Sequence, residues 1–385
     1  MAMTRRDLIA GCSVLWGLDP HWANAADAAA NRPIRNRGKP WRIGYAESLS
    51  FRNFSGTLWG LAQGLSRTGW VGDVRSLPYA ENSTDSAAMW RWLAAQPKDF
   101  IDWVSDAYYS GLSDADPQPI LRRLQSGDLD LILVMGTAAG QKLAIHGHQT
   151  PTLVFSATNP IAAGFAKSET DSGMDHVWAH MDLSRTTRQL KIFHDTCRFR
   201  TLGVTYENSN GGRGVASIPQ VEEMARTLGF QLRARYVQRP ANVKNAGDMR
   251  AYYEQLSRAW MDLSGEVDAM YVTFGQWDLM RFDGLLQPFL ERKVPTFSQS
   301  GQEEVERGAL MSMARADFSG IGTFGATTLA RVFRGAKPRS LAQVYFDTPA
   351  LAVNVEVAQL IGFKLPLEAM LSADTIYPKI LRPGA

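Results

Sequence analysis

The sequence predicts an α/β fold with two doubly wound, Rossmann-like lobes, joined by a hinge and separated by a ligand cleft. Short runs of Val, Ile and Leu alternate with amphipathic segments, as in parallel sheets that helices cover on both faces. This alternation occurs once before residue 160 and again after residue 200, which favours two lobes over one large sheet. The chain has 385 residues, which is long enough for two domains of ordinary size.

The first 25 residues are typical of a secretory signal peptide. Arg5 and Arg6 precede a short apolar stretch over residues 8–18, and Ala23-Asn24-Ala25 provides a small-residue cleavage site. The paired arginines favour the twin-arginine export route, and a general secretory leader is the alternative. Cys12 follows a lipobox-like sequence, but few apolar residues precede it, so we do not expect lipidation there. These features predict a periplasmic protein.

Composition excludes several classes of function. The formal net charge is only +3 and no basic block stands out, so we expect no nucleic-acid partner. No apolar run approaches the ~20 residues that span a bilayer, so we expect membrane contact only through a partner. Once the leader is removed, Cys197 is alone and no internal disulfide is possible.

Residues 26–40 are polar and predict a flexible lead-in to the folded chain. The expected strands and helices follow in chain order. Strands are predicted at 41–45, 129–135, 152–156, 201–206, 231–237, 267–274 and 295–298. Helices are predicted at 54–65, 138–146, 183–193, 218–228, 251–263, 284–292 and 320–333, the last with small residues on one side.

These elements predict a division of the chain into segments that cross between the lobes. Residues 41–160 are expected to form the first lobe and 161–314 the second. Residues 315–345 then return to the first lobe, and 346–385 form a C-terminal segment across the hinge.

An aromatic-rich stretch interrupts the rhythm of the first lobe. Trp90, Trp92, Trp103, Tyr108 and Tyr109 lie in a helix-like sequence with Pro and Asp punctuation. We expect a helical insertion at about 85–125 that packs its aromatic rings on the first lobe. The alternative is a lid or a partner-docking surface.

The turn from Gly136 to Gly140 is the first candidate ligand loop. It joins a buried strand to a helix, and its small residues, Thr137, Ala138 and Ala139 among them, let a ligand approach the backbone. Free N–H groups at the helix start favour a carboxylate or carbonyl group. The spacing fits neither a P-loop nor a dinucleotide-binding fingerprint. A tight strand–helix turn without a ligand is the alternative.

Other loops that follow predicted strands carry polar or aromatic side chains that suit a ligand. Turns, caps or core packing are the alternatives for each of them. We expect hydrogen bonds from the polar residues and flat apolar walls from the aromatic ones. The residues are Thr158, Asn159, Asn208, Ser209, Phe274, Gln276 and Trp277, with Phe51 as a second apolar wall.

Catalytic and metal-binding patterns find little support. His176 and His180 are four residues apart, but Gly173 and Asp175 indicate a loop rather than a helix. His148 is expected to cap the end of a helix, and Cys197 to be a small buried side chain. No nucleophile elbow is present. We therefore expect no catalytic residues, no metal and no cofactor, and a protein that is not an enzyme.

Five stretches of the chain resemble the bacterial ABC-transporter substrate-binding family that includes tryptophan- and tyrosine-binding proteins. They occur in the family's order and span most of residues 42–375. The stretches are 129–141 (LDLILVMGTAAGQ), 151–164 (PTLVFSATNPIAAG), 267–273 (VDAMYVT), 294–310 (VPTFSQSGQEEVERGAL) and 352–374 (AVNVEVAQLIGFKLPLEAMLSAD).

The resemblance implies a periplasmic-binding protein type I fold and a set of ligand-binding loops. Some positions depart from the family pattern. Asn159 stands where the family usually has an acidic residue, and Gly275-Gln276 stands where it has an Asp-Asn pair. The loops implied are Ser48 to Asn53 (with Phe51 and Arg52), Gly136 to Ala139, Thr158 to Asn159, Asn208 to Ser209, Phe274 to Gln276, and Ser298 to Ser300.

These observations together predict an exported, monomeric solute-binding protein. It is expected to capture an amino-acid-like solute or a small carboxylate or amide, and to deliver it to an ABC permease and its ATPase. A periplasmic sensor that feeds a signalling system, and a secreted enzyme on the same scaffold, are the alternatives. The sequence leaves the identity of the ligand open.

Overall fold

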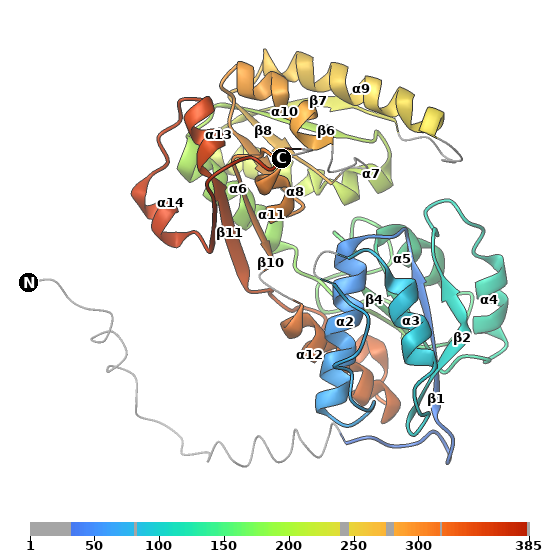
Figure 1. The fold of residues 1–385 in the computed structure, drawn as a ribbon. Helices are drawn as coiled ribbons and strands as arrows, with labels where there is room; N and C mark the ends of the chain where they lie inside the picture. The colour runs from blue at the N-terminus through green and yellow to red at the C-terminus, as the bar shows by residue number, and fades with distance from the viewer. Residues whose placement is uncertain (1–31, 81–82, 239–245, 275–280, 316–317, 383–385) are drawn as a thin grey trace, which may run out of the picture.

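Continuous runs of Val, Ile and Leu form strands that are buried along their whole length, and every residue of Leu131–Met135 is buried. The computed structural model describes residues 32–80, 83–238, 246–274, 281–315 and 318–382. In this part of the chain the strands form two sheets with helices on both faces. Each sheet is the centre of one lobe (Figure 1).

The sheet of the first lobe has the order β2-β1-β3-β4-β5 among the described residues, and all neighbouring strands are parallel. Helices α2, α3 and α12 pack on one face, and α4 and α5 on the other. The strands are β1 (Trp41–Glu47), β2 (Ile101–Tyr109), β3 (Leu131–Met135), β4 (Thr152–Phe155) and β5 (Val177–Ala179). The helices are α2 (Arg52–Arg67), α3 (Ser86–Ala94), α4 (Gln118–Gln125), α5 (Thr137–Leu143) and α12 (Ser319–Phe333), followed by the 3-10 turn η2 (Pro338–Ser340).

The sheet of the second lobe has the order β12-β11-β10-β9-β8-β6-β7, and β10 and β11 are antiparallel. Its core is also covered on both faces, by α6, α8 and α13 on one and by α9 and α10 on the other. The strands are β6 (Thr201–Tyr206), β7 (Gln231–Tyr236), β8 (Ala269–Val272), β9 (Thr296–Ser298), β10 (Met311–Arg315), β11 (Pro349–Asn354) and β12 (Thr375–Tyr377). The helices are α6 (Ser184–Cys197), α7 (Asn210–Val215), α8 (Ile218–Leu228), α9 (Ala246–Ser264), α10 (Phe282–Glu291), α11 (Gln302–Glu306), α13 (Val355–Leu360) and α14 (Leu367–Ser372).

Close packing of α2 against α12 brings a late segment of the chain back to the first lobe (Figure 1). A Cβ added at Gly64 would lie 2.7 Å from the carbonyl oxygen of Gly322, and one at Gly60 would clash with the carbonyl oxygen of Phe318. The predicted small-residue side of the helix at 320–333 therefore faces α2, and larger side chains would push the two helices apart.

The aromatic stretch near residues 85–125 corrects one prediction. Its middle part is the edge strand β2 rather than a helix, and it lies between α3 and α4. The register of β2 against β1 shifts between Ile43 and Tyr45, which breaks the alternation of buried and exposed residues that identifies a strand. The rings pack on the first lobe as expected, and Trp90 meets Trp103 edge to face at 5.4 Å.

The chain crosses between the lobes at residues 180–183 and 341–348, and again between β10 and α12. The first two crossings lie side by side, since the N–H of Met181 donates to the carbonyl of Gln343 at 2.9 Å and the N–H of Tyr345 donates to Met181 at 3.2 Å. Neighbouring crossings that share backbone hydrogen bonds form a narrow hinge.

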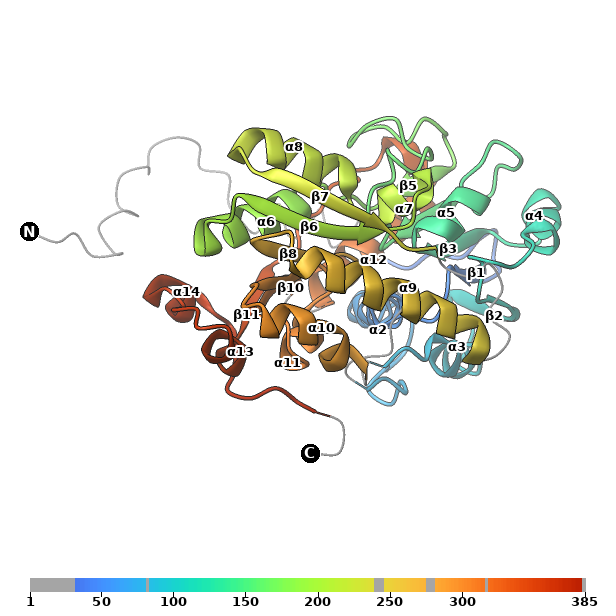
Figure 2. The same ribbon diagram turned by 90° about the horizontal axis from the view of Figure 1, so that it is seen from above.

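The crossings differ in position from the expected division of the chain. Strand β5 belongs to the first sheet, although it follows residue 160, because it pairs with β4. Strands β11 and β12 belong to the second sheet, and Figure 2 shows α13 and α14 at the far end of the molecule from α4. None of the helices in the described part of the chain has the length and apolar character to cross a membrane.

Candidate functional site

A cavity of about 550 Å³ lies between the two lobes. It forms where parallel strands of both sheets end, because the loops after their carboxyl ends converge there, as in other open α/β sheets. The lining residues that follow or end these strands are Ser48 (β1), Gly136 (β3), Ser156 (β4), His180 (β5), Tyr206 (β6), Val237 (β7), Thr273 (β8) and Gln299 (β9).

Ser48 ties the first strand to the candidate loop that begins at Gly136. Its hydroxyl accepts a hydrogen bond from the N–H of Ala139 at 2.9 Å and donates to the carbonyl of Met135 at 3.2 Å. The N–H groups of Thr137 and Ala138 lie in the first turn of α5, where no acceptor exists within the helix. The backbone at Thr137 and Ala138 therefore offers donors beside the cavity, while that of Ala139 is already satisfied.

Gly136 has a conformation that only glycine adopts readily, with φ 91° and ψ 166°. A Cβ at this position would lie 2.5 Å from Cζ of Phe54 and 2.7 Å from the hydroxyl oxygen of Ser48. Backbone conformation and lack of space thus both require glycine here, and they fix the position of the following helix turn against the cavity.

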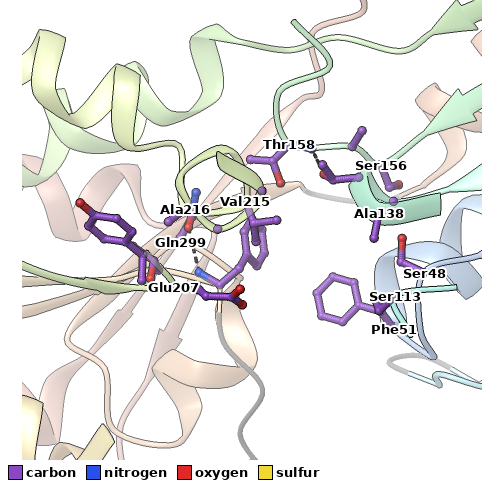
Figure 3. Close-up of a pocket in the computed structure, with 18 of the residues that line it drawn as sticks. Ser48, Phe51, Ser113, Ala138, Ser156, Thr158, Glu207, Val215, Ala216 and Gln299 are labelled. Atoms are coloured by element: carbon purple, nitrogen blue, oxygen red, sulfur yellow. Dashed lines mark hydrogen bonds between the residues drawn. The ribbon is translucent and has the colours of Figure 1, made fainter. Parts of the chain in front are cut away.

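Hydroxyl groups connect the remaining loops of the first-lobe wall. The hydroxyl of Thr137 accepts from the N–H of Thr158 at 3.3 Å. Ser156 has a left-handed backbone with φ 53°, and its hydroxyl lies 3.1 Å from that of Thr57. The wall is therefore polar but uncharged along this stretch, and Figure 3 shows Ser48, Ser156 and Thr158 on the first-lobe side of the cavity.

Glu207 and Ser209 stand on the opposite wall, after β6. Ser209 is the N-cap of α7: its hydroxyl accepts from the N–H of Gly212 at 3.0 Å and donates to Oε1 of Glu207 at 3.3 Å. The N–H of Ser209 also donates to the carbonyl of Glu207 at 2.8 Å. Figure 3 shows Glu207 on the second-lobe side of the cavity, across from Ser48 and Phe51.

Gln299 joins several segments of the second-lobe wall. Its side-chain oxygen accepts from the N–H of Phe274 at 2.9 Å, and its side-chain amide donates to the hydroxyl of Ser217 at 3.1 Å. Its carbonyl accepts from the side chains of Gln189 at 3.3 Å and Arg185 at 3.4 Å. A buried amide with this many partners holds the wall in one arrangement.

Aromatic rings from both lobes meet at the cavity. Phe51 of the first lobe contacts Phe54 at 5.4 Å and Phe274 of the second lobe at 6.1 Å, both edge to face. These rings supply flat apolar surface that a planar ligand can contact.

An ion pair also bridges the two lobes. Arg52, at the start of α2, lies 3.1 Å from Oε2 of Glu303 in α11 and donates to the carbonyl of Ser300 at 3.2 Å. The side chains of Arg52 and Glu303 are 15% and 17% exposed, so solvent screens the pair only in part. Arg52 therefore connects the lobes and is not among the residues that line the cavity.

The structure brings most of the predicted site residues together. Those that line the cavity are Ser48, Phe51, Asn53, Gly136, Thr137, Ala138, Thr158, Ser209 and Phe274. Gln276 and Trp277 lie outside the described residues.

The other predicted residues of the described part are not among those that line the cavity, and Ala139, Asn159 and Ser298 have structural contacts instead. Asn159 is buried and accepts from the N–H of Ala162 at 2.9 Å, three residues on, as a helix N-cap side chain does. Ser298 is buried and hydrogen-bonds Glu304. Asn208 is exposed beside the cavity.

Sequence reasoning missed the part of the lining that comes from the hinge and from the longer polar side chains. His180 and Asp182 come from the first crossing, which follows a strand of only three residues that no pattern identified, and Arg185 comes from the start of α6. Glu207 is adjacent to the predicted Asn208, and its position directly after a predicted strand was the signal that could have found it.

The histidines and the cysteine considered in the sequence have structural surroundings. The ring Nε2 of His148 lies 2.8 Å from the carbonyl of Leu143, so it caps α5 as predicted. His176 and His180 each contact a backbone carbonyl, of Ile145 and Tyr345. Burial raises the pKa of the Cys197 thiol to about 12, which leaves it protonated at neutral pH.

Comparison with protein families gives one match that covers more than half of the chain. The family described as ABC transporter substrate binding protein matches residues 109–376. A search of curated proteins gave no match.

Solved structures show the same two-lobed fold at low sequence identity. An ABC domain from Streptococcus pneumonia in complex with L-Trp has a TM-score of 0.63 and 20% identity, over 88% of this chain and 99% of that one. A conserved domain protein from Vibrio cholerae has a TM-score of 0.61 and 19% identity, over 88% and 100%. A ligand-free, open substrate-binding protein with adhesive properties from Clostridium difficile has a TM-score of 0.58 and 18% identity, over 88% of this chain and 100% of that one.

Proposed function

The chain belongs to the family of ABC transporter substrate-binding proteins and has the periplasmic-binding protein type I fold, and from this premise we propose that it captures a small solute in the periplasm and delivers it to an ABC importer. Family membership indicates a binding role rather than catalysis. The protein would act as a monomer, exported by the twin-arginine route that its first 25 residues favour.

The observation that carries the proposal is the cavity between the lobes. Its volume of about 550 Å³ is in the range of small-molecule sites, roughly 300–1,000 Å³. Loops from both sheets line it, so a bound solute would contact both lobes at once. Such a ligand stabilises the closed arrangement because it loses contacts when the lobes separate.

The chemistry of the lining supports an amino-acid-like solute or a small carboxylate or amide. The backbone N–H groups at Thr137 and Ala138 suit a carboxylate or carbonyl oxygen. Phe51 and Phe274 suit a flat apolar group. The likeness to a structure in complex with L-Trp is consistent with both features.

Closure would strengthen each polar contact. Expelling water lowers the local dielectric constant, so the same hydrogen bond contributes more to binding. Micromolar affinity corresponds to about −8 kcal/mol. A few charge-assisted hydrogen bonds of about 1.5–3 kcal/mol each, with ~100 Å² of apolar surface buried, reach that value.

The first experiment is mass spectrometry of small molecules that co-purify with the mature protein, followed by thermal-shift measurements with each candidate. A true ligand should raise the melting temperature with the logarithm of its concentration above Kd. Deleting the gene should abolish uptake of that solute by the native host. A mature protein that carries no solute, and a deletion strain with unchanged uptake, would contradict the proposal.

A cavity-filling variant tests the position of the site. Ala138 lines the cavity and its side chain is part of the first-lobe wall (Figure 3). Ala138→Trp should reduce affinity for the identified solute by at least about 100-fold, because the indole occupies the space of the ligand. Ala95→Trp, at an exposed helix end, is the matched control and should bind normally. Equal affinities of the two variants would place the site elsewhere.

A further inference from the structure

The cavity has an uneven set of charges. Among the described residues that line it, Asp114, Asp182, Glu207 and Asp347 carry carboxylates, and Arg185 carries the guanidinium. Part of this charge is already compensated within the protein. Asp182 accepts from Arg188 at 2.8 Å and from the hydroxyl of Ser184 at 3.0 Å, and both Asp114 and Asp347 have partners of their own.

Glu207 differs from these carboxylates. The ion pairs formed among the described residues do not include it, and its side-chain contact is the hydroxyl of Ser209 at 3.3 Å. A carboxylate beside a cavity with one long hydrogen bond keeps most of its capacity to accept further ones. Its charge is therefore available to a group that enters the cavity.

The backbone fixes Glu207 at this point. A Cβ at Gly212 would lie 2.7 Å from the Cβ of Glu207 and would clash with its carbonyl oxygen, so α7 packs directly on the residue. The Ser209 N–H holds the same carbonyl at 2.8 Å. The side chain thus projects from a well-determined position, which lowers the entropy cost of using it for recognition.

The other surfaces of the cavity also suit a cation. The rings of Phe51 and Phe274 line it, and aromatic faces attract ammonium groups. The ring of Tyr206 also lines it, but it already meets the guanidinium of Arg213 at 5.9 Å. The guanidinium of Arg185 donates to the carbonyl of Gln299 at 3.4 Å, and the hydroxyls of the first-lobe wall are neutral. Rings and an uncompensated carboxylate together favour a positive group on the second-lobe side.

We infer that the solute carries a protonated amine that pairs with Glu207, and that Glu207 selects such a solute over a carboxylate of the same shape. This inference rests on the proposed function. It adds that the solute carries a positive charge at the end that contacts the second lobe. The opposite end of the ligand is left to the backbone donors of α5.

The test is isothermal titration calorimetry with two matched pairs of probes. Each pair has one ring system with either an amine or a carboxylate: tryptamine with indole-3-propionate, and tyramine with 3-(4-hydroxyphenyl)propionate. The wild-type protein should bind at least one amine about 10-fold or more tightly than its matched carboxylate. A carboxylate that binds as tightly as its amine, or no measurable amine binding at millimolar concentration, overturns the inference.

The variant Glu207→Gln keeps the shape of the side chain and removes its charge. It should weaken amine binding by about 10- to 100-fold, which corresponds to the loss of one charge-assisted hydrogen bond, and leave the carboxylate unchanged or tighter. Glu223→Gln, at an exposed position of α8, is the matched control and should leave both affinities unchanged. An unchanged preference for the amine in Glu207→Gln also overturns the inference.

These outcomes are separable from those of the proposed function. If the mature protein carries a solute and supports its uptake but binds no amine, the selection by Glu207 is wrong and the transport role stands. If it carries no solute and its deletion leaves uptake unchanged, the proposed function itself fails, whatever the probes show.

Discussion

The two walls of the cleft are built in different ways. Around the turn at Gly136, the first-lobe wall consists of small residues and hydroxyls, and its hydrogen bonds involve backbone groups, such as that of Ser48 with the N–H of Ala139. The second-lobe wall carries longer side chains, among them Glu207, Arg185 and Gln299. The first wall thus fixes a shape through its backbone, and the second supplies charged and amide side chains. We expect mutations in the first to act through geometry, and mutations in the second through ligand chemistry.

Gly136 offers the strongest test of this difference. Gly136→Ala places a methyl group against Phe54 and Ser48 in a conformation that alanine avoids. We expect it to lower the free energy of unfolding by roughly 3 kcal/mol and to weaken every ligand alike, because strain and overpacking add. Chemical denaturation and calorimetry measure the two effects.

Gly127→Ala is the control for that substitution. Gly127 also has a positive φ, of 71°, but a Cβ there meets nothing within 4 Å. Gly127→Ala should lower the free energy of unfolding by about 1 kcal/mol, from backbone conformation alone, and leave ligand affinity unchanged. If Gly136→Ala proves no more destabilising than Gly127→Ala, the first wall does not depend on close packing.

The same contrast explains what sequence could predict. Buried runs such as residues 131–135 and the glycine turn after them have local signatures, so the sheets, most helices and most of the first wall were predictable. Strand β2 was not, since its irregular pairing with β1 disrupts the alternation. Strand β5 has only three residues and gave no periodic signal.

The second wall depends on contacts that no local pattern contains. Gln299 gains its role from partners more than 80 residues away, such as Gln189 and Ser217. Arg52 was expected to contact ligand because it lies in a loop of the resemblance, yet its guanidinium reaches Glu303 in the other lobe. Long side chains can reach several sites, so their position in the sequence does not determine which group they contact.

The Arg52–Glu303 pair tests whether the two walls are coupled. Arg52→Ala and Glu303→Ala should each weaken ligand binding about 2- to 10-fold, because both remove a contact between the lobes. Arg52→Ala should weaken binding more than Glu303→Ala, since it also loses the hydrogen bond to the carbonyl of Ser300. Calorimetric affinities of the single and double variants form a double-mutant cycle.

A coupling energy of about 0.5–1 kcal/mol is expected from that cycle for a partly buried pair, and it should decrease at high salt. Strictly additive effects would mean that the pair does not act as a unit in closing the cleft. Lys191→Ala, which removes an exposed pair with Asp195 within α6, is the matched control and should leave affinity unchanged.

The smallest effect is expected from two histidines of the first lobe that do not line the cavity. His148 and His176 have ring centroids 4.9 Å apart. Burial lowers the pKa of both from the usual 6.5, and the neighbouring His148 lowers that of His176 further. Smaller opposing effects come from hydrogen bonds to backbone groups, that of Ile145 for His176 and that of Leu143 for His148. The unfolded chain therefore binds protons at a higher pH than the folded one. Their contribution to stability is present above pH ~6.5 and is lost as the pH falls through the folded pKa values.

Denaturation at a series of pH values from 7.5 to about 5 measures this contribution, since carboxylates titrate mainly below that window. The free energy of unfolding of the wild type should decrease as the pH is lowered through this range, and that of His176→Gln should decrease less steeply. Lys337→Gln, which alters an exposed pair with Asp175, should keep the wild-type slope. Because both rings lie outside the cavity, ligand affinity should stay constant in His176→Gln wherever the protein is folded. A parallel loss of affinity would mean that the shape of the first wall depends on this histidine pair behind it, and not only on the packing around Gly136.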